Sequence, residues 1–322
     1  MGFISKQIEG AYKKILFSRH DPDDRVYYFS QGDFPSLRAH EYEFKNKHGD
    51  LLKGKFYHYL NPKPEKLIVF DHGVAPGYRS YMREIETLCS HGYLVYAFDH
   101  TGCRDSEGEN IRGLTGSLSD LDDCLSALGR IEQLKSFDIM VIGHSRGGFS
   151  ALNILAFHPE IKKIVAMSGF ISLETMQKQI TPFILAPFRK RLFELERECN
   201  PDYVNVSAIK TLGGCDNPAM IVHSKDDATV SSKANFERLK TALSGRDNTE
   251  FLLMTDRDHN PTFTKVAVDY KNQFFKDFAK QKKREKKNPD LIDYSFIARY
   301  DWNKMTEQDM DVWNKIFAFL DK

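Results

Sequence analysis

A serine, an acid and a histidine follow one another along this chain in a context that suits nucleophilic catalysis. Ser145 lies in a G-x-S-x-G pattern at residues 143–147. A serine hydroxyl is a weak nucleophile near neutral pH, so it needs a base and an acid that orients the base. His259 supplies a base, and Asp226 or Asp227 supplies an acid, each directly after a predicted strand. The residues therefore predict acyl transfer through a serine.

The residues on either side of Ser145 predict how its hydroxyl is presented. Residues 137–142 are apolar and β-branched, which predicts a buried strand, and residues 148–157 have apolar positions at helical spacing. A tight turn between them would strain Ser145 and leave room only for glycines two positions before and after it. A glycine-rich turn whose serine only caps the helix is the alternative. The context favours a nucleophile elbow that raises the hydroxyl above the strand.

Eight strand-like runs alternate with helical patterns over most of the chain. The first two runs alternate apolar and polar residues, as in an antiparallel hairpin, whereas the later ones are solidly apolar, as in a buried parallel sheet. The predicted strands are 39–44, 54–60, 66–70, 93–98, 137–142, 163–167, 219–222 and 250–254, and the predicted helices between them are 81–90, 119–134, 148–157, 232–243 and 264–279. We expect a doubly wound α/β sheet with helices on both faces.

The segment between residues 168 and 218 is far longer than an ordinary loop. Helical patterns at 173–180 and 188–199, interrupted at Pro182 and Pro187, predict a helical cap over residues 169–217. The alternative is an excursion packed on the body of the domain. An apolar stripe of Ile4, Ile8, Tyr12, Ile15 and Leu16 predicts an N-terminal helix that docks on the core.

Two sequence patterns near the C-terminus predict where the last two helices end and begin. The basic run 280–287 suits the negative end of a preceding helix dipole, and no interleaved aromatic residues support nucleic-acid binding. Thr306 with Asp309 three residues later predicts the start of the last helix.

On these motifs the chain resembles an α/β-hydrolase over residues 38–320. The resemblance implies an eight-stranded, mostly parallel sheet, with residues 38–168 and 218–322 as the core and 1–37 as an N-terminal extension. Its D-x-x-V pattern implies Asp227 as the triad acid with Val230 closing the turn, while Asp226 remains the competitor. Its D-H-N pattern implies His259 as the base.

The resemblance also implies an oxyanion hole and neighbouring substrate contacts. A His-Gly loop at residues 71–77 implies the backbone N–H of Val74 as one donor, and the residue after the nucleophile, Arg146, supplies the other. His72, Gly73 and His144 are expected beside the substrate. In the loop at 99–108, Cys103-Arg104 stands where the family has a small residue and a glycine, which leaves that loop's conformation open.

The substrate is expected to be a small ester. Apolar cap residues could line an acyl pocket, and a basic cluster after them could meet an anionic leaving group; these are Ile180, Phe183, Ile184, Leu185 and Phe188, followed by Arg189, Lys190 and Arg191. Carboxylesterase is the first interpretation. An acyl-CoA thioesterase, a prolyl-type peptidase and a noncatalytic ligand-binding protein on the same fold are the alternatives.

Composition excludes several other classes of protein. The 46 basic and 45 acidic residues give a net charge of +1, which implies neither nucleic acid nor an anionic membrane as a partner. Five cysteines without C-x-x-C spacing favour a reducing compartment. With no secretory signal and no membrane-length apolar stretch, we expect a cytoplasmic protein without stable membrane anchoring, and the sequence leaves its oligomeric state, a homodimer included, open.

A metal centre is the rival chemical interpretation. Six residues fall near predicted strand ends: Asp71, His72, Asp99, His100, His144 and His223. The sequence has no H-x-H or H-E-x-x-H spacing, and the hydrolase motifs already account for His72 and His144. His223 precedes the acid and is better explained as a packed histidine. We therefore expect neither a metal nor another cofactor.

Overall fold

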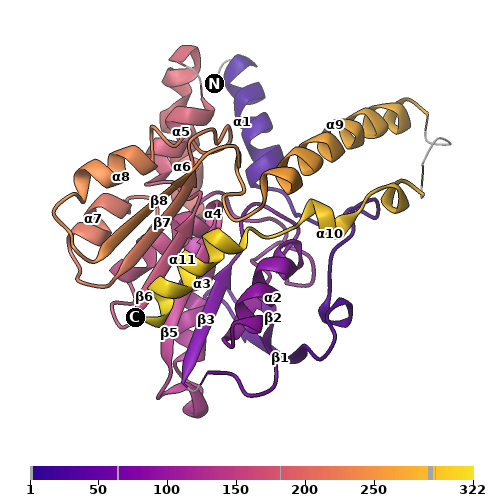
Figure 1. The fold of residues 1–322 in the computed structure, drawn as a ribbon. Helices are drawn as coiled ribbons and strands as arrows, with labels where there is room; N and C mark the ends of the chain where they lie inside the picture. Colours follow the sequence, from indigo (N-terminus) through magenta and orange to yellow (C-terminus); the bar gives the residue numbers. More distant parts are fainter. Residues whose placement is uncertain (1–2, 64, 182, 289–292, 294) are drawn as a thin grey trace.

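A mostly parallel sheet of eight strands forms the centre of the fold and confirms the α/β-hydrolase architecture (Figure 1). A computed structural model describes residues 3–63, 65–181, 183–288, 293 and 295–322, with side chains from Lys6 onward. The strands are β1 (Arg38–Lys45), β2 (Leu51–His58), β3 (Lys66–Asp71), β4 (Leu94–Phe98), β5 (Asp138–His144), β6 (Lys163–Met167), β7 (Ala219–Ser224) and β8 (Thr249–Met254). Their order is β1-β2-β4-β3-β5-β6-β7-β8, with β1–β2 and β2–β4 antiparallel and the rest parallel.

Helices cover both faces of this sheet and extend beyond one edge of it. The α-helices are α1 (Phe3–Leu16), α2 (Met82–Ser90), α3 (Gly116–Leu128), α4 (Arg146–Asn153), α5 (Leu173–Ile180), α6 (Arg189–Cys199), α7 (Ala208–Gly213), α8 (Phe236–Ala242), α9 (Lys265–Lys287), α10 (Trp302–Met305) and α11 (Met310–Asp321). The 3₁₀ turns are η1 (Gln31–Asp33), η2 (Tyr78–Tyr81), η3 (Glu132–Leu134), η4 (Ile154–Ala156), η5 (Phe183–Phe188) and η7 (Phe296–Arg299).

The central strands are apolar on both faces because a separate hydrophobic core lies on each side. In β3, Leu67 and Val69 pack into the core with α3, α4 and α8, whereas Ile68 and Phe70 pack into the core with α2 and α11. Burial of each such side chain contributes roughly 1.5–3 kcal/mol. Two cores therefore hold β3 and β5 rigidly, and the pairing of Asp71 with Gly143 brings their carboxyl ends side by side.

The C-terminal part differs from expectation in two ways. The basic run 280–287 forms the end of α9, as predicted, but α9 is long and with η7 and α10 makes an arm that projects from the body (Figure 1). The predicted cap at Thr306 is wrong. Asp309 caps α11 by accepting a hydrogen bond from the N–H of Asp311 at 3.1 Å, whereas the hydroxyl of Thr306 donates back to Trp302 O at the end of α10.

The N-terminal helix is present, but its apolar stripe is only partly buried. Tyr12 and Leu16 are buried, whereas Ile15 is 61% exposed. The side chain of Ile4 and the predicted helix break at Pro182 lie outside the described residues. Residues 169–217 contain α5, η5, α6 and α7, and their division from the core as a cap remains a prediction. Among the described residues, no helix is long and apolar enough to cross a membrane.

Candidate active site

Ser145 lies on a strained turn between β5 and α4. Its φ of 58° and ψ of −114° are unfavourable for a residue with a Cβ, and such strain persists only where neighbouring structure enforces it. A Cβ added at Gly147 would lie 2.0 Å from the backbone oxygen of Asp71, and one at Gly143 would lie 2.1 Å from Gly147 O. The close approach of β3, β5 and α4 therefore requires these glycines. The turn presents Ser145 at the carboxyl edge of the sheet.

The loops after β7 and β8 bring Asp227 and His259 together. Nδ1 of His259 lies 2.8 Å from Oδ2 of Asp227, whose other oxygen accepts hydrogen bonds from the N–H groups of Thr229 at 2.9 Å and Val230 at 2.8 Å. Burial alone would raise the pKa of Asp227, but hydrogen bonds from His223 and His259 and the charge of His259 hold it well below its ordinary value. Asp227 is thus held as a carboxylate against the imidazole.

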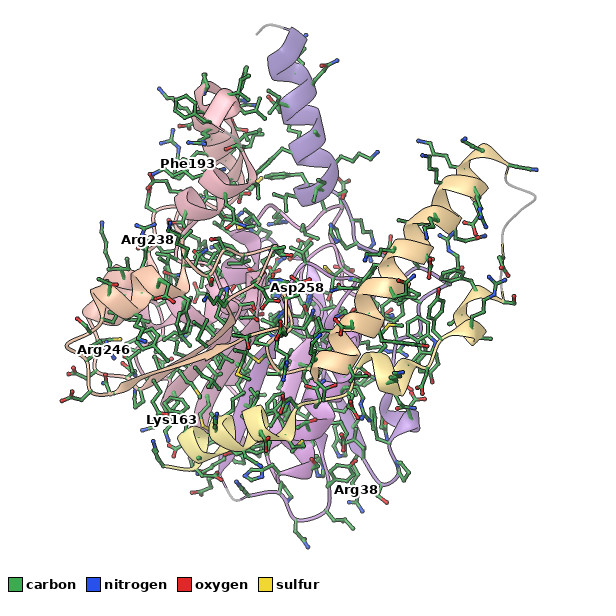
Figure 2. All side chains as sticks on the ribbon, turned by 45° about the horizontal axis from the view of Figure 1, so that its top comes forward. Arg38, Lys163, Phe193, Arg238, Arg246 and Asp258 are labelled. Atoms are coloured by element: carbon green, nitrogen blue, oxygen red, sulfur yellow. The ribbon has the colours of Figure 1, made fainter. Side chains whose placement is uncertain are left out.

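The neighbouring acid, Asp226, points to the other side of this turn. Its carboxylate accepts hydrogen bonds from the hydroxyl of Ser224 at 2.5 Å and from the N–H of Asp258 at 3.1 Å. Asp258 has a positive φ of 45°, in the loop that carries His259. In Figure 2 Asp258 lies between the segment of α5 and α6 and helix α9. Asp226 therefore ties the loop of the histidine to β7 and makes no contact with the imidazole ring among the described interactions.

Two other histidines predicted near this edge have structural partners. His223 is fully buried, and its Nε2 lies 2.8 Å from Val230 O and 3.3 Å from Asp227 Oδ2, so it packs behind the acid. His72 is also fully buried. Its Nδ1–H donates to Gly73 O at 2.8 Å, and its Nε2 accepts from the N–H of His100 at 3.1 Å. His72 therefore holds the loop 71–77 against the loop after β4 from a buried position. This corrects the prediction that His72 contacts the substrate.

His144 joins three parts of the site through a chain of hydrogen bonds. The N–H of Gly73 donates to the hydroxyl of Tyr81 at 3.2 Å, and this hydroxyl lies 3.0 Å from His144 Nδ1. Nε2 of His144 lies 2.7 Å from the backbone oxygen of His259. Burial lowers the pKa of His144 to about 3, so the neutral ring accepts at Nδ1 and donates at Nε2. Sequence reasoning missed Tyr81, since nothing in its local pattern marks this contact.

The two predicted oxyanion donors flank Ser145. Val74 follows Gly73, and a Cβ at Gly73 would lie 3.0 Å from the Cβ of Ser145. Arg146 begins α4, where the first N–H groups of a helix have no partner within it. Neither N–H donates to another described residue. The guanidinium of Arg146 is only 1% exposed and donates to the backbone oxygens of Leu114 and Ile111, so this side chain points away from the site.

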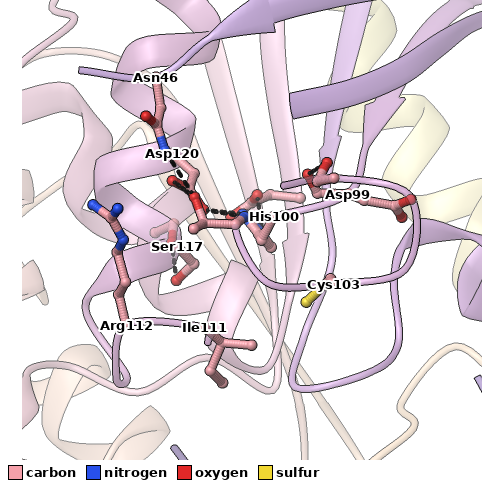
Figure 3. Close-up of polar contacts among 12 residues, drawn as sticks. Asn46, Asp99, His100, Cys103, Ile111, Arg112, Ser117 and Asp120 are labelled. Carbon is pink, nitrogen blue, oxygen red and sulfur yellow. Dashed lines mark hydrogen bonds and ion pairs between the residues drawn. The ribbon is translucent and has the colours of Figure 1, made fainter. Parts of the chain in front are cut away.

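A buried network lies beneath these loops, as Figure 3 shows. His100 lies 2.9 Å from Asp71 and 3.4 Å from Asp120, which also accepts hydrogen bonds from the N–H and hydroxyl of Thr101. Burial alone would lower the pKa of His100, but the contacts with Asp71 and Asp120 raise it to about 9. Within the described part of the chain, no group of three or more His, Cys, Asp or Glu side chains could hold a metal ion.

The loop after β4, whose conformation the sequence left open, contains three residues of positive φ, of which Gly108 has a φ of 107°. Gly102 has a φ of 70° and Arg104 a φ of 40°. Asp99 secures the loop, because its carboxylate accepts hydrogen bonds from the N–H groups of Tyr78 at 2.9 Å and Asp105 at 3.4 Å. Burial raises the pKa of Asp99 to about 7. The unusual Cys103-Arg104 pair is therefore accommodated by backbone conformation.

Two cavities meet at the histidine. One, of about 480 Å³, has Ser145 in its wall and is lined mainly by apolar residues of α1 and of the segment 169–217. The other, of about 590 Å³, is rich in aromatic residues from the segment after α1, from α9 and from α10. Val74, Thr229 and His259 border both cavities. The α9–α10 arm thus contributes to the site, which the sequence did not indicate.

Only some of the residues between 180 and 188 that were expected to contact the acyl group lie beside Ser145. Ile180 and Leu185 line the cavity beside Ser145, but Phe183 and Ile184 are 91% and 82% exposed and point into solvent. Phe188 is half-buried and lines neither cavity. The structure corrects the prediction for Phe183 and Ile184, because η5 turns them into solvent, and Phe188 contributes to neither cavity.

Comparisons with known proteins identify the family and the fold of the chain. The family model described as serine aminopeptidase, S33, matches residues 62–250. An esterase of Pyrococcus furiosus has 22% identity and a TM-score of 0.58, over 75% of this chain and 90% of its own. Another crystal form of that esterase gives 21% identity and a TM-score of 0.58, over 82% of this chain and 98% of its own.

A more distant match has the same architecture. The esterase domain of a Rhodothermus marinus protein has 19% identity and a TM-score of 0.50, over 69% of this chain and 89% of its own. No curated protein matches the sequence. At these identities the structural likeness shows the shared fold.

Proposed function

Because the chain belongs to the serine aminopeptidase S33 family of α/β-hydrolases, we propose that it hydrolyses carboxylic esters through an acyl-enzyme on Ser145. One observation carries this proposal: Nδ1 of His259 lies 2.8 Å from the carboxylate of Asp227, and His259 borders the same cavity as Ser145. A strained serine, an imidazole and a buried carboxylate on three adjacent loops have the roles that nucleophilic catalysis requires.

Each step of the reaction has a residue to perform it. Asp227 accepts a hydrogen bond from Nδ1–H of His259, which leaves the lone pair of Nε2 free to take the proton of Ser145 as its oxygen attacks the ester carbonyl. The N–H groups of Val74 and Arg146 stabilise the resulting oxyanion. His259 then protonates the leaving alcohol. Water attacks the acyl-enzyme by the same route and releases the carboxylic acid.

The lining of the cavity favours an ester over an N-terminal peptide. An aminopeptidase must bind the charged amine of its substrate, and a buried ammonium is costly without a paired anion. None of the described residues that line the cavity beside Ser145 is Asp or Glu, so the acyl side of the site offers no anion to an amine. The adjoining cavity does have carboxylates, from Asp21, Asp23, Glu84 and Asp258. The family description makes an aminopeptidase the second candidate, and proline arylamides test it.

The basic residues of the cap give little support to a thioesterase. Arg189 donates to the hydroxyl of Thr181 at 2.8 Å, and Arg191 pairs with Glu9 at 3.1 Å. Neither borders the cavities that meet at His259. We propose residues 169–217 as a cap whose α5, η5 and α6 cover the acyl side of the site.

Labelling by a fluorophosphonate tests the nucleophile directly. We expect one adduct on Ser145 in the wild-type protein, none in Ser145→Ala, and loss of p-nitrophenyl butyrate hydrolysis in that variant. A Ser150→Ala variant is the matched control, because Ser150 is buried in α4 and donates to Ser117 Oγ at 2.8 Å. Absence of the Ser145 adduct, with intact folding, would favour a noncatalytic binding protein.

A further inference from the structure

The N-terminal helix forms one wall of the cavity beside Ser145, although more than a hundred residues separate them in sequence. Ile8, Ala11 and Ile15 all border this cavity. Their spacing of three and four residues places them on one face of α1. The 61% exposure of Ile15 is thus explained, since its side chain faces the cavity and not the protein core.

Buried hydrogen bonds hold α1 in this place. The hydroxyl of Tyr12 donates to Glu196 Oε1 in α6 at 2.7 Å and accepts from Gln177 Nε2 in α5 at 3.3 Å. Glu196 is fully buried and also accepts from the N–H of Leu114 at 2.8 Å. Figure 1 shows α1 beside the cap helices α5 and α6. The helix and the cap therefore form one fixed enclosure.

Most of the other residues that line the cavity are also apolar. They include Leu114, Phe170, Met176, Ile180, Leu185 and Leu192. Among the described residues that line the cavity, Arg146 alone has a permanent charge; its Nε and Nη2 donate to the backbone oxygens of Leu114 and Ile111, and its Nη1 is buried without a hydrogen-bond partner. A group that enters this cavity from Ser145 thus meets hydrocarbon on both sides, and a charged or strongly polar group would lose its hydration without compensation.

We propose that α1 is the outer wall of an acyl-binding pocket, and that the substrates are esters of unbranched, medium-chain acyl groups. This inference rests on the proposed function, because the acyl group must be attached to Ser145. From Ile8 to Ile15 the wall is about 10 Å long. An extended alkyl chain advances roughly 1.3 Å per carbon, so the wall matches a chain of roughly eight carbons.

The chain-length dependence of hydrolysis tests the pocket. In a series of p-nitrophenyl esters from acetate to palmitate, each added methylene should raise kcat/KM about fourfold until the wall ends near octanoate. The variant Ala11→Phe fills the middle of the wall. We expect it to lower kcat/KM for octanoate ten- to a hundredfold, to affect acetate, whose acyl group is too short to reach Ala11, far less, and to shift the optimum to shorter chains.

A matched variant controls for the added ring. Lys6 is exposed and lies on the opposite face of α1, so Lys6→Phe introduces the same side chain without entering the cavity. It should keep the wild-type profile. If Ser145→Ala abolishes hydrolysis but Ala11→Phe leaves the octanoate preference intact, the acyl pocket is refuted and the proposed function stands.

Binding provides a readout that does not depend on turnover. Titration calorimetry of sodium octanoate into the Ser145→Ala protein should show binding that Ala11→Phe removes and Lys6→Phe retains. Equal octanoate binding by all three proteins, or binding by none, would overturn the pocket even if no ester is hydrolysed. Thermal unfolding of each variant identifies any loss that is due to misfolding.

Discussion

The exchange of Asp227 for asparagine is the sharpest test of the catalytic assignment. Oδ1 of Asp227 is held by the N–H groups of Thr229 and Val230, at 2.9 and 2.8 Å. An asparagine keeps its carbonyl oxygen there, so its amide nitrogen replaces Oδ2, the oxygen nearer to Nδ1 of His259 (2.8 Å, against 3.0 Å for Oδ1), and donates toward Nδ1. The imidazole then carries its proton on Nε2 and cannot accept the proton of Ser145. We therefore expect the imidazole of His259 to keep its position but to carry its proton on the wrong nitrogen.

The expected loss of activity is large. In serine proteases with the same constellation, this exchange lowers kcat about 10⁴-fold, which corresponds to about 5.5 kcal/mol of transition-state stabilisation. Steady-state hydrolysis of p-nitrophenyl octanoate measures kcat, and a fluorophosphonate should label Asp227→Asn correspondingly more slowly. The matched control is Asp226→Asn, which should keep kcat within about tenfold, because Asp226 contacts Ser224 and Asp258 and not the ring.

Stability must be followed in the same proteins. The folded-state pKa of Asp227 lies below its unfolded value, so its ionisation stabilises the protein above the unfolded pKa, and this contribution is lost as the pH falls. Asp227→Asn should therefore have a lower Tm than the wild type at pH 7, and its Tm should change less as the pH is lowered. A folded Asp227→Asn protein with kcat within tenfold of wild type would refute the reasoning, as would an equal loss in Asp226→Asn.

Three further changes test the surrounding structure. Tyr81→Phe leaves the buried N–H of Gly73 and Nδ1 of His144 without partners, so kcat for the octanoate ester should fall ten- to a hundredfold with KM nearly unchanged; a change in KM alone would contradict this. Gly147→Ala places a Cβ 2.0 Å from a backbone oxygen and should lower the free energy of unfolding in urea by about 3 kcal/mol or more, whereas Gly245→Ala, with nothing within 4 Å, should change it by less than about 1 kcal/mol. The raised pKa of His100 gives stability that is complete below its unfolded value and is lost as the pH rises through about 9, so about 3 kcal/mol should disappear between roughly pH 6.5 and 9. His100→Gln should flatten that slope, and an unchanged slope would contradict the assignment.

Local sequence patterns were sufficient to predict the strands of the sheet and the tight turn that carries Ser145. The apolar runs of the parallel strands reflect two cores that bury both faces of each strand, as in β3, and this pattern is readable without knowledge of the partners. Gly143 marks the elbow because the turn itself brings Gly147 O within 2.1 Å of the place of a Cβ, whereas Gly147 is required by the close approach of Asp71 on the neighbouring strand β3. The order of Ser145, the acid and His259 then follows from the order of the strands that carry them.

Contacts between distant segments required the tertiary structure. Asp226 and Asp227 are adjacent on one turn and point to opposite sides of it, so only the position of the loop after β8 decides which carboxylate meets His259. Ile184 is apolar like its neighbours in the cap, yet η5 turns it into solvent. Ile15, from the other end of the chain, borders the cavity in its place. Sequence periodicity shows that a face is apolar, but packing of whole helices determines whether that face meets the core, the solvent or a ligand.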